Sequence, residues 1–160
     1  FKKLVSAARL ADIVPPVLVQ PLDHSPLVVL TAAVGEIYRY YADLSGYADI
    51  AIGSSLILGI QLTRNFDRPL ASVSVAEFWR RWHISLSTWL RDYLYIGLGG
   101  SRRGRLRTYR NLLLTMLLGG LWHGAGWTFI LWGAFHGAGL AGERLLARAR
   151  AQFKRLWEAD

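Results

Sequence analysis

Cysteine is absent from this chain. The sequence therefore contains no disulfide framework, no thiolate nucleophile and no cysteine-ligated metal. No Gly-x-Ser-x-Gly motif is present, so a Ser–His–acid triad is not supported. No two histidines are spaced at i, i+3 or i+4, which argues against a metal or haem site.

Charge is absent from residues 111 to 142, which contain no Lys, Arg, Asp or Glu. This run is longer than the roughly 20 apolar residues that span a bilayer. The whole chain is 52% hydrophobic. These features predict an all-α fold, a polytopic transmembrane helical bundle with interfacial or re-entrant helices.

A helix break is expected inside the uncharged run, at Gly124 or Gly126. Residues 111 to 122 give only about 18 Å of helix, at roughly 1.5 Å per residue. A hydrocarbon core is about 30 Å thick, so a break here would place His123 at depth. One tilted helix running straight through is the alternative.

Positive charge dominates the remainder, with a formal net charge of +8. The arginines concentrate in residues 101 to 110 and 143 to 155, immediately beside apolar segments. This distribution is typical of cytoplasmic loops under the positive-inside rule, and we expect no nucleic-acid partner. The chain begins with Phe1 and shows no secretory leader, so we expect an internal or C-terminal piece of a longer protein.

Three regions are predicted along the chain. Residues 1–25 form a basic, proline-rich connector whose prolines break any helix. Residues 26–143 form the membrane domain, in which Gly46 divides or kinks the first helix. Residues 144–160 form a basic C-terminal helix.

One amphipathic helix is predicted from Phe78 to about Gly100, with its tryptophans and arginines suited to a membrane interface. Ser74 is the expected N-cap before it, and Glu77 completes a capping box.

Histidines in apolar surroundings need a partner or a chemical task, because burial disfavours the protonated ring and a neutral ring still requires hydrogen bonds. His136 lies between Gly133 and Gly137, a small-xxx-small pair that predicts helix packing rather than chemistry. His24 lies in the proline-rich connector and is expected to be incidental.

Several motifs occur in a characteristic order: "YYADLSGYADIAIG", "NFDRP", "EFWRRWHISLSTWLRDYLYIGLGG" and "RTYRNLLLTMLLGGLWHGAGWTFILWGAFHG". In these motifs the chain closely resembles the membrane-bound O-acyltransferase (MBOAT) family, in particular its bacterial alginate O-acetylation branch. The resemblance covers about Glu36 to Gly142 and implies a fragment of a larger MBOAT fold.

The resemblance implies transfer of an acyl group, expected to be acetyl, from a thioester donor such as acetyl-CoA toward a hydroxyl of an exported polysaccharide. It implies a multi-pass protein of the bacterial inner membrane, periplasmic acetyltransferase partner proteins and no bound cofactor or metal. The histidine of "LWHG", here His123, is the expected catalytic residue. The histidine of "RRWHIS", here His83, is the second expected position.

A general base suits this reaction, because an alcohol is a poor nucleophile at neutral pH. Neutral imidazole can take the hydroxyl proton, since the reference pKa of histidine is about 6.5 and burial lowers it. We expect His123 to act as this base. His83 is expected to orient substrate, assist proton transfer or line the same channel, although a hydrogen bond to Ser87 at i+4 is an alternative.

Other candidate site residues are polar or aromatic side chains near these motifs. Substrate or channel contacts are expected from Asp43, Asp49, Trp122 and Ser87. Arg102, Arg103 and Arg105 are candidates for binding donor phosphates, although positive-inside topology alone also accounts for them.

Two other functions remain open. A non-catalytic membrane channel or scaffold, which delivers acyl groups or polysaccharide to a partner enzyme, would need the glycines but no imidazole at position 123. A metal or haem site would require His83, His123 and His136 to converge.

Overall fold

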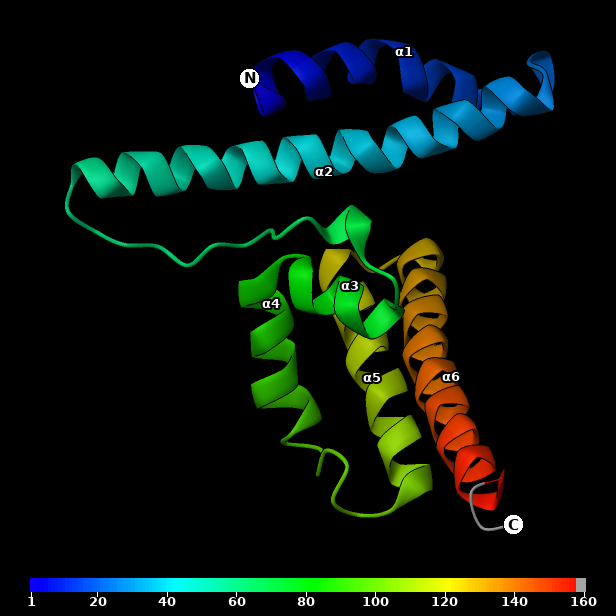
Figure 1. Cartoon of the computed structure of the whole chain (residues 1–160). Coiled ribbons are helices and arrows are strands. Elements are labelled where there is room, and N and C mark those ends of the chain that lie inside the picture. Colours follow the sequence, from blue (N-terminus) through cyan, green and yellow to red (C-terminus); the bar gives the residue numbers. More distant parts are fainter. Residues whose placement is uncertain (158–160) are drawn as a thin grey trace. The chain divides into compact units, whose positions relative to one another are not determined.

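The computed structural model describes residues 1–157 (Figure 1). Its regular elements are helices, and no strand occurs in these residues, which confirms the all-α fold class. The chain forms two compact units, residues 1–65 and the residues from Phe66 onward.

The first unit is built from two helical arms. The first arm consists of the π-helix η1 (Lys2–Ala7) and α1 (Ala8–Val19), and the second is α2 (Pro26–Ile57). The short 3-10 helix η2 (Pro21–Asp23) connects them. Ser25 begins α2 as its N-cap, where its hydroxyl accepts a hydrogen bond from the Val28 N–H at 3.4 Å. Pro26 follows at the first helical position, where its missing N–H costs nothing.

Helix α1 includes Pro15 and Pro16, so the expectation that prolines prevent a helix in residues 1–25 is wrong. Both prolines lie near the C-terminal end of α1, and the fixed φ of proline is itself compatible with a helix. The carbonyl of Pro16 still accepts a hydrogen bond from the Gln20 N–H at 3.3 Å. Helix formation is therefore preserved up to Val19.

Gly46 does not divide the following helix, because α2 continues without interruption from Pro26 to Ile57. Gly46 is buried against η1, and a Cβ at this position would lie 2.8 Å from the backbone nitrogen of Lys3. The glycine therefore permits close packing rather than a kink.

The second unit is a helical hairpin with shorter helices packed against it. Its elements are η3 (Pro69–Ala71), α3 (Val75–Arg81), α4 (Ile84–Trp89), the π-helix η4 (Leu90–Tyr95), α5 (Arg105–His123) and α6 (Trp127–Trp157). Helices α5 and α6 lie side by side and antiparallel, α3 contacts α6, and η4 contacts α5 (Figure 1).

Asn111 on α5 is fully buried. Its Nδ2 donates hydrogen bonds to the carbonyls of Leu98 at 3.1 Å and Gly100 at 3.0 Å. Asn111 therefore fixes the loop after η4 against α5.

The start of α3 confirms Ser74 as an N-cap. Its hydroxyl accepts a hydrogen bond from the Glu77 N–H at 3.1 Å. Glu77 reaches back as expected, although its carboxylate accepts from the N–H of Val73, at 3.0 Å, rather than from that of Ser74.

A single helix from Phe78 to Gly100 is wrong, because α3 ends at Arg81 and α4 begins at Ile84. His83 between them adopts a left-handed conformation, with φ 42° and ψ 57°. An α-helix cannot pass through such a residue.

The break in the uncharged run is confirmed, because α5 ends at His123 and α6 begins at Trp127. The run from 111 to 142 is thus two helical pieces. Within residues 1–157, no helix has both the length and the apolar character needed to cross a membrane. The basic segment predicted as a separate C-terminal helix continues α6 through residue 157, and residues 158–160 lie outside the described residues.

Candidate functional site

His123 lies at the C-terminal end of α5, where the chain turns into α6. A Cβ at Gly124 would lie 2.7 Å from Cε2 of Phe129, so a larger residue would require the Phe129 ring to shift. The turn is closed by a hydrogen bond from the Gly126 N–H to the Gly124 carbonyl at 2.9 Å. The sequence thus places the imidazole at a fixed helix end, where it is exposed.

Three aromatic rings surround the imidazole of His123. The ring centroid of Trp122 lies 5.2 Å away and that of Trp132 lies 5.3 Å away, both in T-shaped arrangements. Phe129 is stacked with a centroid distance of 6.0 Å. The base candidate therefore contacts three aromatic rings and is still exposed.

His83 lies at the break between α3 and α4, and its side chain is partly buried. Its ring stacks on Phe66, with 6.1 Å between centroids and 12° between planes. Burial lowers the pKa of His83, and the charge that nearby His123 would carry lowers it further. The structure thus brings together the two histidines that the sequence placed in separate motifs.

The left-handed backbone of His83 is unusual for a residue with a side chain and costs about 1–2 kcal/mol. Such strain is retained where the surrounding structure requires it, often at functional sites. The expected partner of its ring, Ser87, bonds elsewhere: the Ser87 hydroxyl donates to the Trp82 carbonyl at 2.9 Å. The backbone N–H of Ser87 donates to the His83 carbonyl, also at 2.9 Å.

His136 joins the same group of rings from α6. Its ring lies 4.7 Å from Trp132 and 5.2 Å from Trp79, between centroids. Gly133 and Gly137 on either side pack against α5, where a Cβ at either position would lie within 3.0 Å of α5 backbone. The small-xxx-small pair therefore does serve helix packing, as predicted.

We call the connected rings the aromatic cluster. It consists of Phe66, Phe78, Trp79, Trp82, His83, Trp122, His123, Phe129, Trp132, Phe135 and His136. Its three histidines are separated by other rings, and among the described residues no group of three metal-binding side chains lies close enough to hold an ion.

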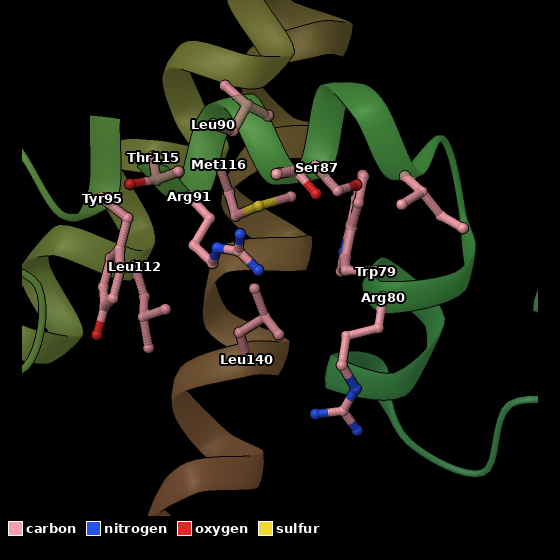
Figure 2. A pocket seen from close by; sticks show the side chains of 12 residues that line it. Trp79, Arg80, Ser87, Leu90, Arg91, Tyr95, Leu112, Thr115, Met116 and Leu140 are labelled. Carbon is pink, nitrogen blue, oxygen red and sulfur yellow. The ribbon is translucent and has the colours of Figure 1, made fainter. Parts of the chain in front are cut away.

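A pocket of about 360 Å³ shares Trp79 with the aromatic cluster (Figure 2). It is lined by Trp79 and Arg80 from α3, Ile84, Ser87 and Thr88 from α4, Leu90, Arg91 and Tyr95 from η4, Leu112, Thr115 and Met116 from α5, and Leu140 from α6. Among residues 1–157, nothing accepts a hydrogen bond from the buried indole N–H of Trp79. The predicted site residue Ser87 thus lies in this pocket. Sequence reasoning missed most of the others, because their convergence depends on tertiary packing.

Asp43 and Asp49 belong to the first unit, where they form ion pairs with η1. Asp49 binds the ammonium of Lys2 at 2.7 Å, and Asp43 binds that of Lys3. Both pairs are partly exposed, and surface pairs of this kind contribute about 0–1 kcal/mol each. These contacts connect η1 to α2, and the expected substrate or channel contacts of the two aspartates stay a prediction.

The predicted phosphate-binding arginines are exposed. Arg102 and Arg103 lie in the loop before α5, and Arg105 is the first residue of that helix. The aliphatic part of Arg103 covers Gly99, with its Cδ 3.3 Å from where a Cβ would be. Their guanidinium groups are thus accessible to an anion.

Sequence comparison gives the site its context. The model of the membrane-bound O-acyltransferase family matches residues 21–157. This chain belongs to that family. The match includes His83, His123 and the whole aromatic cluster, so the residues brought together by the second unit lie within the region that the family model matches.

Individual MBOAT proteins are similar over much of the chain. A probable alginate O-acetylase AlgI of Azotobacter vinelandii is 67% identical over 68% of this chain and 22% of its own length. A peptidoglycan O-acetyltransferase of Helicobacter pylori is 51% identical over 72% of this chain and 22% of its own length. A teichoic acid D-alanyltransferase of Streptococcus thermophilus is 36% identical over 80% of this chain and 33% of its own length. The chain therefore spans between about a fifth and a third of these relatives.

Proposed function

We propose that this chain carries the catalytic histidine of a membrane O-acyltransferase, which moves an acetyl group from a thioester donor toward hydroxyls of an exported polysaccharide. The observation that carries the proposal is the exposed imidazole of His123, held at a glycine-closed helix end within the family-matched region. The names of the relatives support a polymer as acceptor, since they include alginate and peptidoglycan acetylating proteins.

In the proposed reaction, the neutral imidazole of His123 removes the proton from an acceptor hydroxyl. The hydroxyl oxygen attacks the thioester carbonyl carbon and forms a tetrahedral intermediate. The carbon–sulfur bond then breaks, and the leaving thiolate takes the proton back from the imidazolium. An ester and a free thiol result, and the histidine returns to its neutral state.

His83 is proposed to assist this transfer as a second neutral imidazole. Its lowered pKa favours the uncharged ring at neutral pH, so it adds no charge that would oppose formation of the His123 imidazolium. A neutral ring also has one donor and one acceptor nitrogen, which suits it to orienting a hydroxyl.

Roles for the remaining candidate residues are proposed from the chemistry of their side chains. Arg102, Arg103 and Arg105 supply accessible guanidinium groups for donor phosphates, such as those of acetyl-CoA. Trp122 and Ser87 are proposed to border the acceptor path, since one contacts His123 and the other lines the pocket. We further propose a multi-pass inner-membrane location, with periplasmic acetyltransferase proteins as partners.

His123→Ala and His123→Gln test this proposal in the protein expressed from its natural gene. The acetyl content of the exported polysaccharide is measured, together with membrane abundance and detergent-extracted size. Loss of a general base predicts activity reduced by about 10²- to 10⁴-fold at normal abundance. His24→Ala is the matched control, because His24 is exposed and lies outside the second unit.

Near-normal acetylation by His123→Gln would instead favour the channel or scaffold function, which needs no imidazole at this position. That result would remove His123 from the mechanism.

A further inference from the structure

Ring contacts surround the imidazole of His123. Within residues 1–157, its ring nitrogens have no hydrogen-bond partner, and three ring contacts accompany its electrostatic interaction with His83. A base that transfers a proton must nevertheless be held within hydrogen-bond reach of the reacting hydroxyl. Its orientation therefore depends on whichever neighbouring ring is itself fixed.

Trp132 is the best fixed of the three neighbouring rings. Trp122 is 65% exposed and Phe129 is 38% exposed, whereas Trp132 is partly buried. Only Trp132 among them is also packed by further rings of the aromatic cluster, Trp79 at 5.7 Å and His136 at 4.7 Å between centroids.

The backbone beside Trp132 is also fixed against α5. The adjacent Gly133 packs so closely that a Cβ there would lie 2.4 Å from the Met116 carbonyl oxygen. Gly120 on α5 lies similarly close to the Phe129 carbonyl. The indole of Trp132 is thus held by its neighbours and by its own backbone, and its T-shaped contact at 79° restricts how the His123 ring can turn.

We propose that Trp132 is a positioning residue for His123, and that Trp79 and His136 hold its indole in place. This inference rests on the proposed function of His123. It assigns His136 a role in the site through ring packing, without a proton-transfer step of its own.

Trp132→Leu and Trp132→Phe test the proposal in membranes that contain the protein expressed from its natural gene. Radiolabelled acetyl-CoA is the donor probe, and transfer to the cell's own exported polysaccharide is followed as kcat and as KM for the donor. Misplacing a catalytic group by about 1 Å can reduce the rate by about 10²-fold. We expect Trp132→Leu to lower kcat by about 10- to 100-fold with little change in KM.

Trp132→Phe should recover part of this loss, because a smaller ring keeps one aromatic contact but cannot reach both histidines. The matched control is Trp89→Leu, since Trp89 is 53% exposed on α4 and contacts Tyr93 rather than the aromatic cluster. It should leave kcat unchanged. Should Trp132→Leu fail to accumulate, Trp132→Phe decides alone, with a reduction in kcat of about 3- to 10-fold at unchanged KM expected.

Wild-type kcat in either accumulated variant overturns the positioning role. A loss confined to KM also overturns it, because it indicates binding rather than positioning. His123→Ala in the same membranes separates the two proposals: if it is inactive while Trp132→Leu is fully active, only the positioning proposal fails. If His123→Ala is itself active, the proposed function fails.

Discussion

Gly133 controls how closely α5 and α6 approach, and its replacement by alanine is expected to impair both stability and activity. A Cβ at this position would lie 2.4 Å from the carbonyl oxygen of Met116 and 2.9 Å from Cα of Leu117. Both are backbone atoms, so no side-chain rotation relieves the clash. To restore ordinary contact the helices must separate locally by about 1 Å.

The expected cost combines two opposing effects. Overpacking costs about 1–3 kcal/mol. Alanine is favoured over glycine inside a helix by about 1 kcal/mol. Because the clash is with backbone, we expect a cost near the upper limit and a net loss of about 2 kcal/mol from the free energy of unfolding. The same separation would move Trp132 relative to His123, and we expect the proposed acetyl transfer to fall by about tenfold or more.

The assay is thermal unfolding of detergent-purified protein, combined with acetyl transfer in membranes. Gly142→Ala is the matched control on the same helix, because a Cβ there would meet no atom within 4 Å. It should stabilise the protein by up to about 1 kcal/mol. If Gly133→Ala were as stable and as active as Gly142→Ala, close backbone contact would not be what holds the hairpin together.

Further predictions concern Asn111 and His83. Asn111→Ala should lower the free energy of unfolding by about 2–4 kcal/mol, because it removes the side-chain donor to the carbonyls of Leu98 and Gly100. Denaturant unfolding measures this loss, and a value under about 1 kcal/mol would contradict the prediction. His83→Gly should be about 1 kcal/mol more stable than His83→Ala, since only glycine adopts the left-handed backbone freely, and equal melting temperatures would contradict this. Because the folded-state pKa of His83 is lowered, the unfolded chain binds the proton first as pH falls below about 6.5, so stability should decrease from there down to the folded pKa. His83→Gly should flatten that dependence in melts from pH 7.5 to 5, and an unchanged slope would show that His83 is not the group responsible.

Local rules predicted several features of the second unit correctly. The break at Gly124 follows from helix length and glycine placement, the cap at Ser74 from its hydroxyl, and the packing role of Gly133 and Gly137 from their spacing. Each of these depends on residues within a few positions of one another, which is the range over which sequence alone carries the physical information.

Features set by tertiary packing were not predictable in this way. The amphipathic pattern of residues 78–100 continues through His83, where the structure has a break between two helices. A histidine in the sequence does not by itself indicate a left-handed backbone. Gly46 was expected to interrupt a helix, yet it provides close contact with η1. The contact between Trp132 and His136 could be predicted from their i, i+4 spacing on α6. The contact of Trp132 with His123 could not, because it forms only when α5 and α6 pack as a hairpin.

Both candidate histidines lie at helix boundaries, and this has a consequence for how the site is built. His83 occupies a break between two short helices, and His123 ends α5. A side chain inside a helix is directed by the helix itself, whereas one at a boundary depends on neighbouring elements for its direction. The ring contacts of Phe66 with His83 and of Trp132 with His123 supply that direction. Substitutions where α5 packs against α6 should therefore alter the proposed acetyl transfer through geometry, even where they remove no group that takes part in the chemistry.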